Sequence, residues 1–196
     1  MPKIIITGGP GSGKSTLLEA LGKIGFACVP EASRQLIQQQ VALGTDCLPW
    51  KDLAGFARLS LDKMTSDYVV DNHQDTFFDR GIPDIIAYLQ AGGLGVPPFY
   101  YETAKRFSYA ATVFIAPPWK HIYINDAERW QTFEEACILY EAIKNVYKEL
   151  GYNLIEIPCV PVEKRVRFLL GKLNENNLKR FRDEHILPET LPSVKS

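Results

Sequence analysis

The sequence predicts a three-layer α/β/α fold, in which a five-stranded parallel sheet lies between two layers of helices. Short apolar runs alternate along the chain with longer segments of helical periodicity, which is the pattern of a parallel sheet covered on both faces. A glycine-rich segment directly follows the first apolar run. At 196 residues the chain is long enough for one well-buried domain and too short for two of ordinary size.

Each predicted strand is short, apolar and bounded by Gly, Pro or a charged residue. The five strands are expected at 3–7, 26–29, 76–79, 111–115 and 153–157. Helices are expected at 14–23, 32–41, 53–71, 83–91, 99–107, 133–150 and 162–173. Thr132 and Glu135 have the spacing of a capping box at the start of the sixth of these helices.

The domain is predicted to span residues 1–171, followed by a carboxyl-terminal helix end and polar tail at 172–196. The chain has 22 Lys and Arg against 23 Asp and Glu, so its overall charge gives no reason to expect nucleic-acid binding. No run of apolar residues is long enough to cross a membrane, and the amino terminus lacks the features of a secretory signal. A cytoplasmic protein is the expectation.

Residues 8–15, GGPGSGKS, fit the phosphate-loop pattern G-x-x-x-x-G-K-[ST] in the required order of strand, loop and helix. The alternative is a glycine-rich turn that binds nothing, but all four fixed positions match. Backbone amides of such a loop converge on phosphates, the lysine reaches the terminal phosphates and the serine hydroxyl binds Mg²⁺. The predicted nucleotide contacts are Gly8, Gly9, Pro10, Gly11, Ser12, Gly13, Lys14, Ser15 and Thr16.

Asp79 and Arg80 follow the third predicted strand, at the sheet edge where ligands bind in open parallel sheets. Asp79 is predicted to orient the hydrated Mg²⁺ held by Ser15, because hard cations prefer oxygen ligands. Arg80 is predicted to pair with a phosphate or with Glu31. The structural alternative is an aspartate that caps the next turn beside an ordinary ion pair.

Glu31 follows the second strand in the same way, and Arg34 lies one helical turn further on the same face. This carboxylate is predicted to accept the proton of a substrate hydroxyl that attacks the γ-phosphate, with Arg34 beside it. The alternative is that Glu31 only complements the helix dipole while Arg34 is solvated.

The polar and aromatic segment after the fourth strand is too long for a tight connection and is predicted to form a lid. Arg129 is the catalytic candidate in that lid, although an arginine between two acids is also typical of a surface salt bridge. Trp50 and Arg58 are substrate-binding candidates near the third helix, whose apolar stripe is otherwise typical of core.

The carboxyl-terminal region is basic and is interpreted either as a solvated face or as a contact surface for a protein or an acidic lipid. Its basic residues are Lys164, Arg165, Arg167, Lys172, Lys179, Arg180 and Arg182.

The segments 6–16, 29–34, 78–81, 116–119, 125–129 and 132–136 resemble the small bacterial AAA-domain "predicted ATPase" family of phosphate-loop NTPases over about residues 3 to 170. More distantly, the chain is similar to nucleoside and nucleotide kinases, including the ribosylnicotinamide kinase domain and deoxynucleoside kinases. The resemblance implies a kinase-like fold that binds a nucleotide. Those families place an acid after the second strand, an acid-arginine pair after the third and an arginine in a lid, where this chain has Glu31, Asp79-Arg80 and Arg129.

Two functions follow from these features. The preferred one is a Mg²⁺-dependent small-molecule kinase that transfers the γ-phosphoryl group of ATP to a nucleoside-like or other metabolite. The alternative is a nucleotide-dependent switch, or a slow ATPase or GTPase, acting on a protein or lipid partner. The absence of an N-K-x-D motif favours ATP over GTP.

Overall fold

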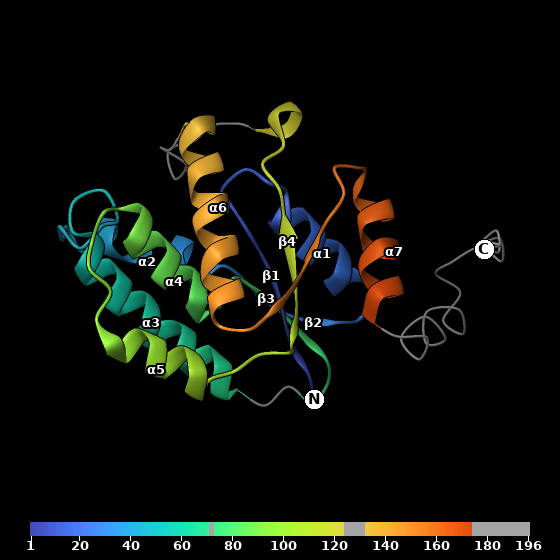
Figure 1. Cartoon of the computed structure of the whole chain (residues 1–196), viewed down its shortest axis with the longest axis horizontal. Coiled ribbons are helices and arrows are strands. Elements are labelled where there is room, and N and C mark those ends of the chain that lie inside the picture. Colours follow the sequence, from blue (N-terminus) through green and yellow to red (C-terminus); the bar gives the residue numbers. More distant parts are fainter. Residues whose placement is uncertain (71–72, 124–131, 174–196) are drawn as a thin grey trace, which may run out of the picture.

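The computed structural model describes residues 1–70, 73–123 and 132–173, and these form three layers around one sheet (Figure 1). The strands are β1 (Lys3–Gly8), β2 (Ala27–Val29), β3 (Thr76–Asp79), β4 (Thr112–Ala116) and β5 (Asn153–Glu156). They lie parallel in the order β2-β3-β1-β4-β5, so the five-stranded parallel sheet is confirmed.

The helices occur where the periodicity predicted them, with ends that differ by at most two residues. They are α1 (Lys14–Lys23), α2 (Ala32–Ala42), α3 (Leu53–Val69), α4 (Ile82–Ala91), α5 (Pro98–Arg106), α6 (Phe133–Glu149) and α7 (Val162–Leu173). The capping box is present, because the Glu135 amide donates to Thr132 Oγ1 and the Thr132 amide donates to Glu135 Oε2. A short 3-10 turn at Lys120–Ile122 was not predicted.

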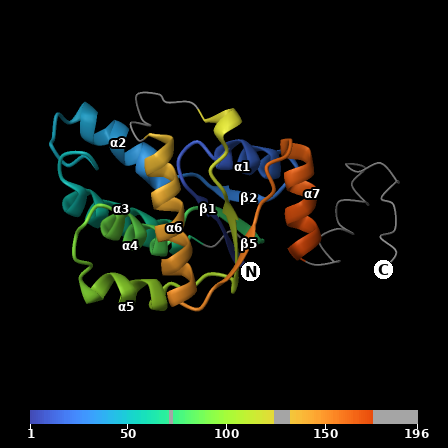
Figure 2. The ribbon, with the colours of Figure 1, turned by 45° about the horizontal axis from the view of Figure 1, so that its top comes forward.

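The central strand β1 divides the core into two halves. Ile5 packs with residues of α3, α4 and α6 on one face, whereas Ile4 and Ile6 pack with α1 and α7 on the other. Figures 1 and 2 show α1 and α7 together on one side of the sheet and α3 to α6 on the other. Because both faces are covered, all three isoleucines are at most 2 % exposed.

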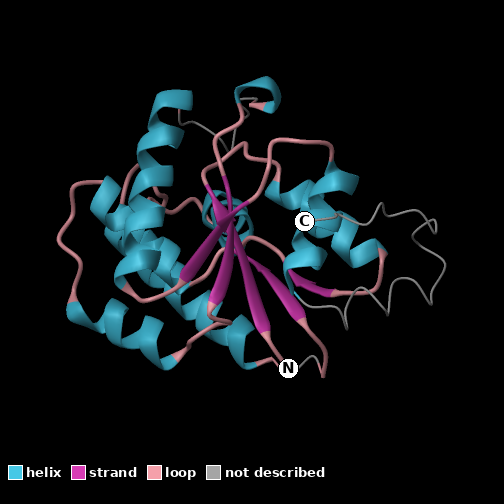
Figure 3. Ribbon diagram, turned by 45° about the vertical axis from the view of Figure 1, so that its right-hand side comes forward, coloured by secondary structure: helices cyan, strands magenta, loops and turns pink. Residues whose placement is uncertain are grey.

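The register aligns the carboxyl ends of the inner strands, with Ile6 opposite Asp79 and Val29 opposite Phe78. The residues that follow β1, β2 and β3 therefore meet at one edge of the sheet, toward which the strands converge in Figure 3. None of the helices in the described residues is long and apolar enough to cross a membrane.

Candidate functional site

The loop between β1 and α1 has the backbone geometry of a phosphate cradle. Gly8 has φ 136°, and a Cβ there would lie 2.3 Å from the Ala116 carbonyl oxygen, so only glycine fits. Gly13 has φ 76° and begins α1 without a side-chain cap. The first amides of α1 therefore remain available to an anion at the positive end of the helix dipole.

Lys14 lies inside this loop and is only 4 % exposed. Its Nζ donates to the Gly9 carbonyl oxygen at 2.9 Å and to Ser12 Oγ at 3.5 Å. Burial, together with the charge of Arg80, lowers the pKa of Lys14 to about 8. A buried ammonium group held by a backbone carbonyl lacks a counter-charge in the loop, and a phosphate would supply it.

One cavity of about 820 Å³ begins at this loop and continues past the ends of β2 and β3 to the helices beyond. Such a volume is near the upper end of the usual ~300–1,000 Å³ for small-molecule sites. The phosphate end is lined by Pro10, Gly11, Ser12, Gly13, Lys14, Ser15 and Thr16. The far end is lined by residues of α2, α3, α4 and α6.

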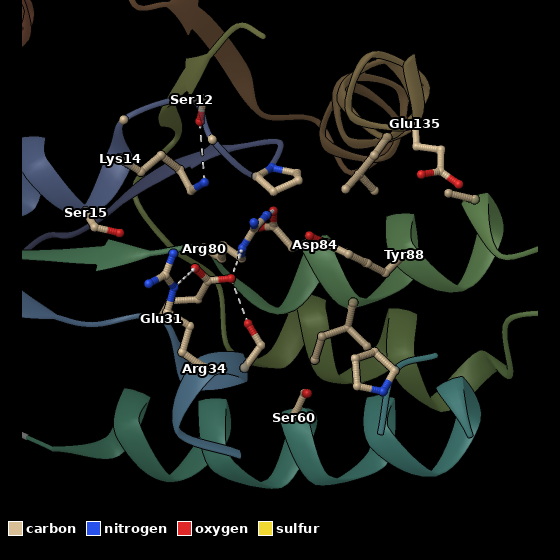
Figure 4. A pocket seen from close by; sticks show the side chains of 18 of the residues that line it. Ser12, Lys14, Ser15, Glu31, Arg34, Ser60, Arg80, Asp84, Tyr88 and Glu135 are labelled. Atoms are coloured by element: carbon tan, nitrogen blue, oxygen red, sulfur yellow. Dashed lines mark hydrogen bonds and ion pairs between the residues drawn. The ribbon is translucent and has the colours of Figure 1, made fainter. Parts of the chain in front are cut away.

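Glu31 stands between these two ends and is held by two arginines. Its Oε1 accepts from Arg80 Nε at 2.9 Å and from Ser33 Oγ at 2.7 Å, and its Oε2 lies 3.6 Å from Arg34 Nε. Figure 4 shows this carboxylate between the two guanidinium groups. Burial would raise the pKa of Glu31, but the charges of Arg80 and Lys14 outweigh it and lower the pKa to about 2. Glu31 is thus ionised throughout the neutral range.

Arg80 connects the phosphate loop to the rest of the site. Its Nη1 donates to the Gly8 carbonyl oxygen at 2.8 Å and lies 3.5 Å from Asp84 Oδ1. Burial opposes its charge, yet Glu31 raises the pKa of Arg80 well above the ordinary value. Its φ of 73° is strained for a residue with a Cβ, and such strain persists where surrounding contacts determine the conformation.

Asp84 is the structural centre that sequence reasoning missed. It is 1 % exposed and accepts hydrogen bonds from Thr7 Oγ1, from Tyr147 Oη at 2.6 Å and from the Gly81 amide at 2.9 Å. The available signal was its place in the first turn of α4, three residues after the helix-starting Gly81. Asp84 thus forms an ion pair with Arg80 and, through its hydrogen bonds to Thr7 and Tyr147, connects α4 to β1 and α6.

Asp79 and Ser15 are the residues that fit a Mg²⁺ ion. Asp79 is 4 % exposed, and its Oδ1 is one of two buried side-chain polar atoms without a hydrogen-bond partner among the described residues. Burial raises the pKa of Asp79 to about 6, although Lys14 opposes the shift. Ser15 lines the cavity, whereas Asp79 lines a smaller space beside Arg80. An unpartnered, poorly solvated carboxylate oxygen is the kind of group that a hydrated cation satisfies.

Arg165 is the second buried group that lacks a partner, at Nε. The interpretation of the basic carboxyl-terminal residues as a solvated face is wrong for this one, which is 3 % exposed. Its Nη1 donates to the Gly13 carbonyl oxygen at 3.3 Å, and its guanidinium lies 5.9 Å from the centre of the Trp119 ring. Helical spacing alone could not reveal this, because the contact joins α7 to a loop 152 residues earlier.

The remaining candidates divide into three groups. Arg34 lines the cavity beside Glu31. Trp50 and Arg58 do not line it: Trp50 is 41 % exposed, and Arg58 stacks 5.1 Å from the Phe99 ring centre and lies 3.7 Å from Asp62. Arg129 and the basic residues after 173 lie outside the described residues.

Comparison with solved structures gives the same fold at low sequence identity. Deoxyadenosine kinase from M. mycoides, with products dCMP and a flexible dCDP bound, has a TM-score of 0.63 at 18% identity, over 89% of this chain and 99% of that chain. Shikimate kinase from Acinetobacter baumannii gives 0.57 at 17% over 91% and 96%. Thymidylate kinase from Ehrlichia chaffeensis gives 0.56 at 16% over 89% and 100%.

A search of curated proteins found no match. The solved structures establish a kinase-like phosphate-loop fold, in agreement with the α/β/α layers and the loop geometry. A family described as "AAA domain" matches residues 3–165, which is most of the chain. The chain therefore belongs to that AAA-domain family.

Proposed function

We propose that the protein is a Mg²⁺-dependent kinase that transfers the γ-phosphoryl group of ATP to a hydroxyl of a small molecule. The observation that carries this proposal is the continuous cavity of about 820 Å³, which runs from the phosphate loop past Glu31 into a space lined by α2, α3, α4 and α6. A protein that only hydrolyses ATP has no need of so large a space beyond Glu31. GTP is the alternative donor, and a cytoplasmic location fits a metabolite kinase.

The donor is assigned to the loop side of the cavity. The loop amides and Lys14 would bind the β- and γ-phosphates. Trp119, Ile122, Arg165 and the segment 160–162 line the cavity on the side of α7, where an adenine ring would find apolar and stacking contacts. The unpartnered Arg165 Nε gives this side a donor for the nucleotide.

Ser15 and Asp79 would hold the Mg²⁺ ion, directly and through its waters respectively. When bound, the ion neutralises charge on the β- and γ-phosphate oxygens. Asp79 favours a cation because burial leaves its charge poorly solvated, as its raised pKa indicates.

The acceptor is assigned to the side of Glu31. Its Oε2, whose nearest protein cation is 3.6 Å away, is the oxygen suited to accept the substrate hydroxyl hydrogen bond. With a pKa of about 2, Glu31 is a poor base, so we assign it the role of orienting the hydroxyl and receiving the proton late in transfer. A loose phosphoryl-transfer transition state requires little base assistance.

Arg80 and Lys14 would stabilise the charge on the transferred group, and Arg34 and Arg129 are further candidates for that role.

The rival function is a nucleotide switch or slow NTPase with a protein or lipid partner. It predicts nucleotide-dependent binding of a partner and no phosphorylated small-molecule product. We favour the kinase because the cavity extends well beyond the space that a triphosphate and an attacking water require.

The test is a mass-spectrometric screen of hydroxyl metabolites incubated with the protein, Mg²⁺ and γ-¹⁸O-labelled ATP. The expected result is a labelled phosphomonoester whose formation falls about 10²-fold or more in Glu31→Ala. Glu19→Ala is the matched control, since Glu19 is exposed on α1. Labelled inorganic phosphate as the only product, formed equally by Glu31→Ala, would contradict the kinase and favour the NTPase.

A further inference from the structure

We propose that the phosphoryl acceptor is an uncharged alcohol with a mainly apolar body, of the alkyl, terpenoid or aryl class. Its hydroxyl would lie beside Glu31 and its body would fill the far end of the cavity. This inference rests on the proposed kinase function and adds the chemistry of the acceptor. It comes from the side chains that line the far end.

The lining beyond Glu31 is predominantly apolar, and it is contributed by four helices and the connection before α3. Its apolar members are Ile37, Pro49, Leu53, Phe56, Ala57, Met64, Ile85, Ala91, Gly92, Ile138 and Leu139. Burial of an apolar ligand against such a wall is favourable in proportion to the area removed from water.

Charged groups are concentrated at the opposite end. Among the described lining residues, Lys14, Glu31, Arg34, Arg80, Asp84 and Arg165 lie on the phosphate loop, close to the ends of β2 and β3, or on the side of α7. Glu135 lies at the start of α6 and is engaged in the capping box. No charged side chain of α3 lines the cavity in the part of the chain that the structure describes. A second phosphate or a carboxylate on the acceptor would therefore find no cation at the far end.

Among the described residues, the uncharged hydrogen-bonding side chains of this end are the hydroxyl groups of Ser60 and Tyr88. Ser60 on α3 is 5 % exposed, and Tyr88 on α4 lies with its ring 5.3 Å from the Arg80 guanidinium carbon. Neither hydroxyl makes a hydrogen bond with another described residue, and Figure 4 shows Ser60 directed from α3 into the cavity. They can serve one or two polar groups on the acceptor.

Two hydroxyl groups provide too few hydrogen-bonding partners for a nucleobase or a polyhydroxylated ring. A nucleobase carries several donors and acceptors on its edge, and no Asn, Gln or His side chain lines the cavity within the described ranges. Polar ligand groups that leave water without a partner weaken binding strongly. The lining thus favours an acceptor with few polar groups besides the reacting hydroxyl.

The opening of the cavity, like its interior, has an apolar side chain. Ile138 lines the cavity although it is 63 % exposed, so it lies where the cavity opens to solvent. Exposed apolar groups beside an opening are typical of sites that admit apolar ligands.

In the transfer step, the alcohol oxygen forms a bond to the γ-phosphorus while the bond to the β–γ bridging oxygen breaks. ADP leaves with that electron pair, and the hydroxyl proton passes through Glu31 to solvent. The product is a phosphomonoester of the alcohol. No other reactant is needed.

The test measures binding of linear primary alcohols from butanol to decanol, by calorimetry, to the full chain with and without Mg²⁺ and a nonhydrolysable ATP analogue. We expect the Kd to fall about fourfold per methylene added until the cavity is full. Thymidine, deoxyadenosine and shikimate serve as polar comparators and should bind more weakly than decanol. A Kd that does not change with chain length, or tighter binding of a comparator, would overturn the inference.

Matched surface variants locate the binding. Ile138→Lys is expected to weaken decanol binding at least threefold, because it places a charge at the opening. Leu43→Lys, at a similarly exposed apolar position that does not line the cavity, should leave decanol binding unchanged. Equal effects of the two variants would place the alcohol elsewhere and contradict the proposal.

Turnover of the same compounds with MgATP separates this inference from the kinase proposal. Phosphorylation of a nucleoside together with chain-length-independent alcohol binding would preserve the kinase and reject the apolar acceptor. Chain-length-dependent binding with hydrolysis as the only reaction would preserve the apolar site and reject the kinase. Phosphorylation of the better-binding alcohols is the result expected if both hold.

Discussion

The two ends of the cavity are built in different ways. The phosphate end comes from one short segment, residues 8–16, whose backbone conformation and single lysine determine its chemistry. The end that we assign to the acceptor is assembled from side chains of α2, α3, α4 and α6, which lie far apart in the sequence. The comparison teaches that a binding site for phosphates, a group shared by all nucleotides, can be formed by one short segment. A binding site for a particular second ligand depends instead on the packing of several helices.

Glu31 and Arg80 join the two ends. Arg80 contacts the Gly8 carbonyl on the phosphate side and Glu31 and Asp84 on the other, so a change at either end is transmitted through one buried guanidinium. Truncating a buried charge pair on one side is costly, about 3–5 kcal/mol, because the partner is left uncompensated. Variants that keep the shape of a side chain are therefore the informative ones.

The largest expected effect is at the phosphate end. Lys14→Met should lower phosphoryl transfer by about 10²–10³-fold, because the ammonium group stabilises charge on the transferred phosphoryl group. Steady-state kinetics on the folded variant measures this. Lys23→Met on the exposed end of α1 is the control and should behave as wild type. A Lys14→Met variant that loses acceptor binding but keeps its kcat would contradict the assignment of Lys14 to the phosphate end.

Glu31→Gln tests the role of the carboxylate that lies between the two ends of the cavity. The variant keeps the shape of the side chain and loses its charge, so transfer should fall about 10²-fold while the Kd of the Mg-nucleotide changes less than threefold. Kinetics and calorimetry on the same preparation measure the two quantities. A change confined to nucleotide affinity would assign Glu31 to the donor side instead.

Asp79→Asn should separate stability from function. The pKa of Asp79 is raised in the folded protein to about 6, from an ordinary 3.8, so the stability contributed by its protonated form is complete below 3.8 and is lost as pH rises through 6. Removing the charge should thus stabilise the Mg²⁺-free protein at pH 7.5 by up to about 3 kcal/mol, and by little at pH 4. Denaturant unfolding at both pH values measures this.

The same variant should bind Mg-nucleotide more weakly than wild type. If Asp79→Asn is neither more stable at pH 7.5 nor weaker toward Mg²⁺, Asp79 serves only to close the turn after β3. That outcome would contradict the assignment of Asp79 to the Mg²⁺ site.

The smallest effect is the pH dependence of nucleotide binding. Because the pKa of Lys14 is lowered to about 8 in the free protein, binding a triphosphate above that pH must take up a proton. The Kd should therefore rise with pH above 8, approaching about tenfold per unit. Calorimetry in buffers of different ionisation enthalpy detects the proton, and Lys14→Arg, charged throughout, should show no such uptake.

The sequence alone determined the α/β/α fold, the sheet and the phosphate loop. Apolar periodicity sets the helices and strands because each buries one face or both, and the glycine positions set the loop because no Cβ fits there. These features depend on neighbours within a few residues, so a linear pattern records them. The pairing of Arg80 with Glu31 was also an expected alternative, since both follow strands that end at one edge.

Only the tertiary structure decided what surrounds these residues. Asp84 is buried because α4 brings it against Thr7 and Tyr147, and Arg165 contacts the Gly13 carbonyl of the phosphate loop because α7 packs beside α1. The apolar far end of the cavity likewise exists only when four helices meet, while Trp50 and Arg58, which were substrate candidates by residue type, do not line it. The physical reason is that burial and pairing between distant segments depend on helix packing, and residue spacing along the chain does not record that packing.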